Sequence, residues 1–303
     1  KKDLAAVLIV FVGAFGIIQV GQKLGVLDTF FGNLAIGYAD NGVCYSCVIT
    51  WMDTGIDKPE EYSAQAMKDI FDKGELGDDG IYTPGKDDDT NVGDTPNILY
   101  LQLESFFDPY LVKGLEFSQD PIPYFRSLMD EYSTGELIVP SVGAGTANVE
   151  FEVMTGISAR FFGPGEYPYK SVLKEETCET TAYDLKQLGY STHAIHNHRG
   201  AFYYRNIVFA NMGFDTFTCL EYMNNVMKTP KNWAKDGILT ENIMSALEST
   251  KNKDYIYTIS VQGHGRYPDE QVLENPLITC DNAATEELKW NYEYYANQIY
   301  EMD

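Results

Sequence analysis

Short apolar segments alternate with helical patterns from residue 97 onward, and this alternation constrains the fold more than any other feature. Apolar runs predict strands at 97–103, 191–195 and 255–261, buried in the sheet at 97–103 and 255–261, and a shorter strand at 136–139. Helical patterns cover residues 124–131, 148–154, 180–187, 238–247 and 283–302. Strands that alternate with such helices build βαβ units, so we predict an α/β fold with a mostly parallel sheet and helices on both faces. Because the chain stops at a helix where another strand is usual, we expect the C-terminal part of the fold to be missing.

Polar side chains lie where the predicted strands end. Glu104 follows the first strand directly, His196 follows the strand at 191–195, and His264 follows the last strand after a short turn. Thr146 comes after two glycines at the start of a predicted helix. Active sites of parallel sheets gather at the carboxyl ends of the strands, so these four residues are the candidate site.

Each of these residues also has a purely structural interpretation. Glu104 is placed to cap a turn, and Thr146 is placed to be an ordinary helix N-cap. His264 lies between two glycines, which allow backbone or ligand to approach closely. Of the other histidines, we expect His193 to be packed inside its strand and His198 to face solvent.

The charge balance excludes one class of partner. The chain has 22 Lys and Arg against 45 Asp and Glu, a formal net charge of −23, and a pI near 4.4. A nucleic-acid backbone must be met by Lys and Arg, so we predict no nucleic-acid partner.

The N-terminus predicts a membrane anchor. Residues 4–20 form an apolar run interrupted only by Gln19, and as a helix it is about 25 Å long, the short end of a bilayer crossing. Lys1 and Lys2 precede the run, and a positive flank stays cytoplasmic, which places the rest of the chain outside the cell. A signal peptide and a buried core helix are the alternatives. We therefore assign residues 1–22 to a transmembrane helix at the cell membrane.

The next segment, residues 23–95, is interpreted as a juxtamembrane region and an acidic linker. Asp87, Asp88 and Asp89 lie among glycines, but their spacing does not fit a calcium-binding EF-hand loop. Five cysteines are spread over the chain, and Cys44 and Cys47 have the spacing of a redox or metal pair without a second pair nearby. We interpret these two as small buried apolar residues. Residues 96–303 remain for an extracellular catalytic domain.

The order and spacing of several motifs between Pro96 and Pro268 give a specific resemblance. The matching pieces are Pro96-Asn97-Ile98 through Leu103-Glu104-Ser105, Gly145-Thr146-Ala147-Asn148-Val149-Glu150-Phe151-Glu152 with Thr155-Gly156, His196 with Phe202-Tyr203-Tyr204-Arg205, Gly213-Phe214-Asp215, and Gly263-His264-Gly265. With these motifs the chain resembles the lipoteichoic acid synthases, phosphoglycerol transferases of the sulfatase and alkaline phosphatase superfamily. The apolar anchor and the stretch at 53–59 also match the approach to that family's extracellular domain.

The resemblance implies a mechanism and a set of roles. Thr146 is expected to be the nucleophile, and Glu104 with Thr146 to bind one divalent metal, Mn²⁺ or else Mg²⁺ or Zn²⁺. Positions matching the family's substrate contacts are His264, Arg205, His196 and Tyr203, the last standing where the family commonly has Trp. The implied reaction passes glycerol phosphate from phosphatidylglycerol to a lipoteichoic-acid-type polymer or a glycolipid through a phospho-threonine intermediate.

One part of the family pattern has no match in the chain. The family expects an Asp-His pair that completes the metal site, and no Asp-His dipeptide follows His264. Either the chain ends before that pair, or the protein is a non-catalytic binding protein for glycerophosphate polymers with an incomplete metal site. A phosphoethanolamine transferase of the same superfamily is the other enzymatic alternative. No cysteine has the sequence context of a sulfatase nucleophile.

Overall fold

The computed structural model describes residues 2–27, 31–52, 55–56, 58–73, 95–141 and 143–303. The acidic stretch at 87–89 lies outside the described residues. The chain divides into two compact units: one is formed by residues 1–95, 140–145 and 157–168, and the other by residues 96–139, 146–156 and 169–303.

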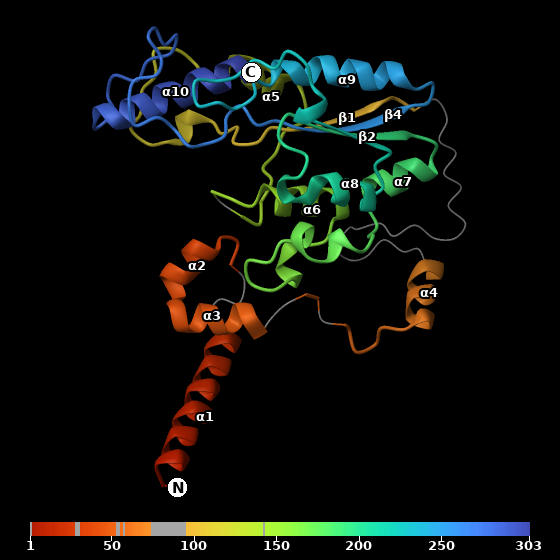
Figure 1. The fold of residues 1–303 in the computed structure, drawn as a ribbon, viewed down its shortest axis with the longest axis vertical. Helices are drawn as coiled ribbons and strands as arrows, with labels where there is room; N and C mark the ends of the chain where they lie inside the picture. The colour runs from red at the N-terminus through yellow and green to blue at the C-terminus, as the bar shows by residue number, and fades with distance from the viewer. Residues whose placement is uncertain (1, 28–30, 53–54, 57, 74–94, 142) are drawn as a thin grey trace. The chain divides into compact units, whose positions relative to one another are not determined.

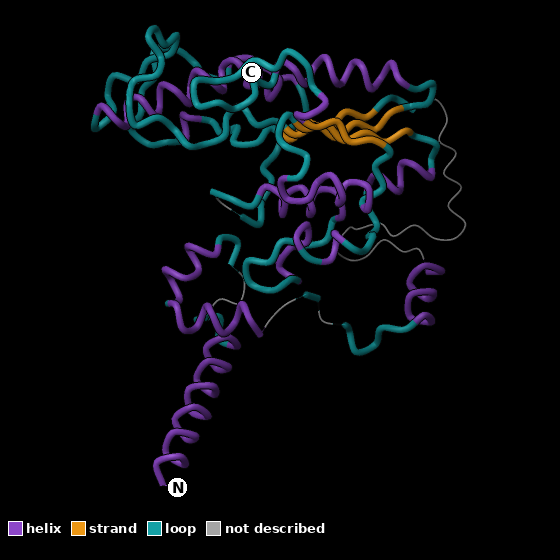
Figure 2. The backbone as a smooth tube through the Cα atoms, in the orientation of Figure 1, coloured by secondary structure: helices purple, strands orange, loops and turns teal. Residues whose placement is uncertain are grey.

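The larger unit contains a parallel sheet. Its strands are β1 (Ile98–Gln102), β2 (Ser191–His196), β3 (Thr216–Cys219) and β4 (Asp254–Ile259), in the spatial order β1-β4-β2-β3. Every pairing is parallel, as predicted from the alternating pattern. Figure 2 shows the strands gathered in one sheet. The strand at 216–219 was not predicted, because four residues give too short an apolar run to recognise.

Helices cover both faces of this sheet. Figure 1 shows α5 (Pro123–Glu131), α9 (Gly237–Ser249) and α10 (Glu286–Met302) on one face, and α6 (Thr146–Thr155), α7 (Thr181–Gln187) and α8 (Arg205–Asn211) on the other. Short 3₁₀ turns of this unit occur at Pro109–Leu111, Val172–Lys174, Phe202–Tyr204 and Leu220–Tyr222. A further turn, Ala159–Phe161, belongs to the smaller unit, and Pro168–Lys170 crosses the boundary between the two. The predicted helices are confirmed within a few residues at each end.

Local sequence explains where these helices begin and end. The Thr285 hydroxyl accepts a hydrogen bond from the Leu288 backbone N–H at the start of α10 (3.2 Å), and Thr180 does the same for Tyr183 in α7 (3.3 Å). Gly189 has a φ of +87°, a left-handed conformation that glycine adopts without strain, just after α7 ends.

The hydrophobic core lies around the central strands. Every residue of β4 is buried, and so are all residues of β2 after Ser191. On the face of α8, Phe209 is fully buried and its ring packs edge-on against Phe217 (4.9 Å) and Phe214 (5.5 Å). His193 is buried in β2 and pairs with Thr216 and Asp254, as expected of a packed histidine.

Two strand predictions need correction. β1 was expected to be buried, but it is an edge strand that exposes Leu99 (49%) and Leu101 (55%). An edge strand has a neighbour on one side only, which an apolar sequence does not reveal. Residues 136–139 form no strand, and Ile138 is 94% exposed. Apolar residues form a strand only where a partner strand is in reach, and this segment has none among the described residues.

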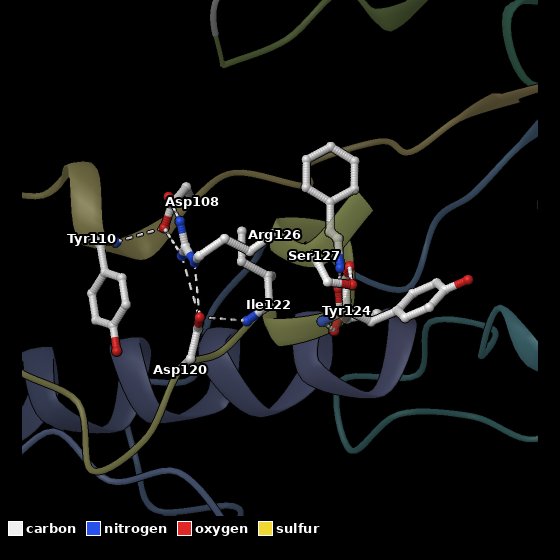
Figure 3. Close-up of polar contacts among 9 residues, drawn as sticks. Asp108, Tyr110, Asp120, Ile122, Tyr124, Arg126 and Ser127 are labelled. Carbon is white, nitrogen blue, oxygen red and sulfur yellow. Dashed lines mark hydrogen bonds and ion pairs between the residues drawn. The ribbon is translucent and has the colours of Figure 1, made fainter. Parts of the chain in front are cut away.

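A cluster of ion pairs and hydrogen bonds connects the segment that follows β1 to helix α5. Arg126 of α5 donates from Nε to Asp120 (2.8 Å) and from Nη1 to Asp108 (3.0 Å), and Figure 3 shows its side chain between the two carboxylates. Arg126 holds the pKa of Asp120 below its ordinary value. The Asp303 carboxylate accepts hydrogen bonds from two backbone N–H groups in the first turn of α5 (2.7 and 2.8 Å).

The smaller unit contains α1 (Lys2–Lys23), α2 (Leu34–Asn41), α3 (Val43–Met52) and α4 (Ala64–Lys73). Within the described residues, α1 is long and apolar enough over Ala5–Lys23 to cross a membrane, and that stretch has no buried residues in this structure. All five cysteines are free thiols. Cys44 and Cys47 are exposed on α3, so the prediction that they are buried is wrong.

Candidate active site

The carboxyl edge of the sheet brings three of the predicted residues together. Gln102 of β1 and His196 of β2 both lie beside Ile259 of β4, so the three strands end at the same level. Glu104 and His264 belong to the loops that follow β1 and β4 from this edge. The prediction that polar residues after the strands share one edge is therefore confirmed by the register.

Thr146 lies against Glu104. It is the first residue of α6, and its hydroxyl donates a hydrogen bond to Glu104 Oε1 at 2.8 Å. The same carboxylate oxygen is 3.6 Å from Nε2 of His264. A hydroxyl, a carboxylate and an imidazole from three separate elements therefore meet at one point.

Glu104 is largely shielded from solvent, and its backbone is hydrogen-bonded to the loop after β4. Its side chain is 12% exposed, and its backbone N–H donates to the Ser260 hydroxyl at 2.8 Å. Burial raises the pKa of Glu104, although the hydrogen bond from Thr146 and the nearby His264 and Arg205 side chains act in the opposite direction. Ser105, the next residue, has a φ of +59°, which is strained backbone for a residue other than glycine.

A cavity of about 410 Å³ opens beside this cluster. Its basic lining residues are Arg199, Arg205, Lys228, Lys231, His196, His198 and His264. Among the described residues that line it, Glu104 is the single carboxylate. In a chain with a net charge of −23, this concentration of cationic and imidazole groups indicates a site for an anionic ligand.

Two histidines of the cavity are kept neutral. His196 is 1% exposed, and its Nδ1 donates to the Ile259 carbonyl oxygen at 2.9 Å, which leaves Nε2 as the acceptor. Burial, followed by the charge of Arg205, lowers the pKa of His196 well below its ordinary value. The same two causes lower the pKa of His198 to about 4. His198 lines the cavity instead of facing solvent, so that prediction is wrong; its ring packs against Phe202 and Trp233.

Arg205 reaches the cavity from a buried position. The side chain is 1% exposed, and its Nε donates to Glu150 Oε2 at 3.0 Å while Nη2 donates to Oε1 of the same carboxylate. Its Nη1 donates to the Phe202 carbonyl at 3.4 Å. Glu150 is fully buried on α6, one turn after Thr146, so one helix carries both the hydroxyl and the carboxylate that orients Arg205.

Tyr203 is not a lining residue of the cavity. Its backbone has a φ of +56°, and its ring makes cation–π contacts with the Lys170 ammonium (4.9 Å from the centroid) and the Arg205 guanidinium (5.2 Å). The neighbouring Phe202 lines the cavity and is 49% exposed. The predicted substrate contact of Tyr203 stays a prediction, as do those of His196, Arg205 and His264.

Two of the residues that are expected from the sequence to bind a metal lie together. Glu104 and Thr146 place two oxygen atoms 2.8 Å apart, and oxygen donors suit Mn²⁺ or Mg²⁺. Within the part of the chain that the structure describes, no group of three or more His, Cys, Asp and Glu side chains is arranged to hold a metal ion. These two residues fit two positions of a divalent-metal site, which is fewer than a tight site uses.

Several site residues escaped the sequence reasoning. Trp233 packs its ring against His264 at 4.3 Å, and Lys228 and Lys231 belong to the same loop around an isolated β-bridge. Asp236 accepts hydrogen bonds from Asn197 and from the backbone of the loop after β4, and so joins two loops of the site. No local pattern marked these residues; for Glu150 the signal was its spacing of four from Thr146.

Comparisons with known proteins place this arrangement in a family. The sulfatase family model matches residues 96–303, which is more than half of the chain. The chain belongs to the sulfatase family. A Rhizobium meliloti (strain 1021) protein, named as a candidate cyclic β-1,2-glucan modification protein, is 29% identical over 240 residues, 79% of this chain and 35% of that protein.

Two solved structures have a similar fold. The Streptococcus pyogenes phosphoglycerol transferase GacH, in complex with sn-glycerol-1-phosphate, matches with a TM-score of 0.62 and 22% identity over 82% of this chain and 64% of its own. The lipoteichoic acid synthase LtaP from Listeria monocytogenes matches with a TM-score of 0.57 and 20% identity over 80% of this chain and 56% of its own. The chain thus spans about a third of the Rhizobium protein and 56–64% of these two structures.

Proposed function

We propose that this sulfatase-family chain is the membrane-anchored part of a phosphoglycerol transferase. It moves glycerol phosphate from phosphatidylglycerol to a hydroxyl of a lipoteichoic-acid-type polymer or a glycolipid outside the cell. The observation that carries this proposal is the Thr146 hydroxyl, 2.8 Å from the buried Glu104 carboxylate, beside a cavity lined with basic groups.

The reaction takes two displacements at phosphorus. In the first, Thr146 Oγ1 attacks the phosphorus of phosphatidylglycerol, the bond to the diacylglycerol oxygen breaks, and diacylglycerol leaves with a proton. In the second, an acceptor hydroxyl attacks the same phosphorus, and the Thr146 oxygen leaves and regains its proton. Covalent catalysis of this kind divides one difficult substitution into two easier ones.

The residues of this chain prepare Thr146 for attack. Its proton points at Glu104, and burial makes that carboxylate a stronger base than an exposed one. Thr146 begins α6, so the first N–H groups of the helix lie near its oxygen, where they favour negative phosphoryl oxygens. A divalent metal, Mn²⁺ by our prediction, supplies positive charge that favours the ionised hydroxyl when Glu104 and Thr146 hold it.

The cavity supports the assignment of substrate roles. Arg205, oriented by Glu150, and His264, 40% exposed beside Glu104, are proposed to contact the transferred phosphoglycerol group, together with His196, which lines the same cavity. Phe202 and Trp233 add apolar ring surface next to these polar groups. A small polyol phosphate needs both kinds of contact.

The names of the relatives support glycerol phosphate as the transferred group, and they favour an acceptor that contains sugar. GacH is a phosphoglycerol transferase with sn-glycerol-1-phosphate bound, and the Rhizobium relative is named for modification of a glucan. A glycan or glycolipid hydroxyl is therefore the acceptor that we favour over a bare polyglycerophosphate chain.

The test is the release of diacylglycerol from phosphatidylglycerol by the intact protein in vesicles. We expect Thr146→Ala to reduce release to background, while Thr155→Ala, the same change at the other end of α6, leaves it within about threefold of wild type. Full activity of the Thr146→Ala variant overturns the proposal. Release from phosphatidylethanolamine but not from phosphatidylglycerol shows instead the phosphoethanolamine transferase.

A further inference from the structure

Helix α3 presents an entirely apolar face to its surroundings. The exposed residues are Val43, Cys44, Cys47, Val48, Trp51 and Met52. Their spacing repeats every four residues, so they form one stripe along the helix. Trp51 is 81% exposed and Val43 is 68% exposed.

The opposite face of α3 holds the polar groups. Ser46 is fully buried, and its hydroxyl donates to the Gly37 carbonyl of α2 at 3.2 Å. The Thr50 hydroxyl donates to the Ser46 carbonyl at 2.7 Å and lies 3.4 Å from the Tyr38 hydroxyl. Helix α3 is thus inverted with respect to a helix of a water-soluble protein, with its polar groups toward α2 and its apolar groups outside.

The low charge and the short helices of the α2–α3 hairpin are compatible with a position at a membrane surface. Between residues 31 and 52 the sequence has one charged residue, Asp40, and α2 also exposes Leu34 (42%) and Ile36 (52%). At 8 and 10 residues, α2 and α3 are about 12 and 15 Å long, half or less of the roughly 30 Å hydrocarbon core. Neither helix spans a bilayer, but both are long enough to lie along one of its surfaces.

The hairpin is fastened to the end of α1. Gln22, in the last turn of α1, donates to the Tyr45 hydroxyl of α3 at 3.1 Å. The backbone N–H groups of residues 26 and 27 both donate to the Gly21 carbonyl oxygen, which closes a turn at the end of α1. Figure 1 shows α2 and α3 beside this end of α1. If α1 crosses the membrane, its end at Lys23 marks the headgroup level, and α3 lies at that level.

We propose that the α2–α3 hairpin is a second membrane contact, an interfacial element whose exposed apolar face lies in the lipid bilayer. Trp51 then occupies the headgroup boundary that tryptophan favours. The inference rests on the membrane placement of α1 in the proposed function, and it adds a contact with the leaflet that contains the proposed lipid donor.

The test measures the depth of Trp51 in vesicles of phosphatidylcholine and phosphatidylglycerol. The intact protein with Trp233→Phe and Trp290→Phe retains Trp51 as the tryptophan of the described chain. We expect lipids brominated about 5–10 Å below the headgroups to quench Trp51 emission, and aqueous iodide to have little effect. The matched control, Trp51→Phe with Trp233→Phe, retains Trp290, and its emission should not respond to brominated lipid.

Flotation with the vesicles separates the two ways to fail. Protein that does not float refutes the membrane placement of α1, and the inference with it. Protein that floats but whose Trp51 responds to iodide and not to bromine refutes the inference alone.

A cysteine measurement keeps the test independent of the tryptophan replacements. In the otherwise unchanged protein, Cys47 should resist a polar maleimide in vesicles and react after detergent is added. Labelling of Cys47 in intact vesicles contradicts a lipid-buried face. Efficient Cys47–Cys47 cross-linking between copies, with protection from both quenchers, shows that a second copy covers the face and also overturns the proposal.

Discussion

The buried ion pair between Arg205 and Glu150 predicts a large and specific loss of stability. Both side chains are essentially inaccessible to water, at 1% and 0% exposure, and two guanidinium nitrogens bind the two carboxylate oxygens. Removing one partner leaves the other as an uncompensated buried charge, which costs about 3–5 kcal/mol. We therefore expect Glu150→Ala to lower the free energy of unfolding by about that amount.

The double replacement should cost much less than the two single ones together. Glu150→Met with Arg205→Met removes both charges and fills similar volume, and such exchanges of buried pairs are often close to neutral. Each kcal/mol shifts the melting temperature of a domain this size by about 2–4 °C, so Glu150→Ala should lower it by about 6–20 °C. The exposed Glu248 of α9 is the control, because Glu248→Ala should cost less than about 0.5 kcal/mol.

The assay is urea unfolding of the intact protein in mild detergent, followed by tryptophan emission. A decrease in the free energy of unfolding below about 1 kcal/mol for Glu150→Ala contradicts this prediction, because a buried charge without its partner destabilises the fold by more than that. Additive losses in the double variant refute it as well, since they show that the two side chains contribute independently.

Three further predictions concern the supports of the site. Folding lowers the pKa of His198 from the ordinary 6.5 to about 4. As the pH falls, the unfolded chain therefore binds a proton first, and the stability of the fold should decline from about pH 6.5 to pH 4. His198→Gln should flatten this part of a plot of melting temperature against pH, and an unchanged slope contradicts the assignment. Asp236 receives hydrogen bonds from Asn197 and from the loop after β4, so Asp236→Ala should cost about 2–3 kcal/mol and reduce diacylglycerol release, and wild-type values of both rule out its role in joining the loops. Arg126 keeps the pKa of Asp120 low, which stabilises the fold above the ordinary pKa and is lost as the pH falls through the lowered one; Arg126→Met should cost no more than about 1 kcal/mol at neutral pH and remove part of the acid dependence seen by calorimetry.

The alternation of strands and helices was readable from sequence because each element carries its own period. The rule that active sites gather at the carboxyl ends of parallel strands then predicted that Glu104, His196 and His264 lie at one edge. The register of the structure has the ends of their strands at the same level. Local chemistry also sets some helix ends without the rest of the fold, as at Thr285 before α10 and Gly189 after α7.

The structural features that could not be predicted from sequence depend on neighbours that are distant in sequence. Whether β1 is central or at the edge depends on which strands lie beside it, and its apolar residues look alike in both cases. The position of His198 depends on Trp233, 35 residues later, and that of Cys47 depends on which face of α3 packs on α2. On α3, Ser46 is buried and Trp51 is exposed. The prediction for this segment assumed the pattern of a helix in water, with apolar side chains buried and polar ones exposed, and α3 has the reverse.

The most direct test of the account is to look for the covalent intermediate. The intact protein is incubated with phosphatidylglycerol without acceptor, quenched in acid, digested and examined by mass spectrometry. We expect a glycerophosphoryl group on Thr146 that is absent from the Thr146→Ala protein. Diacylglycerol release with an unmodified Thr146, or with the group on another residue such as His264, contradicts it.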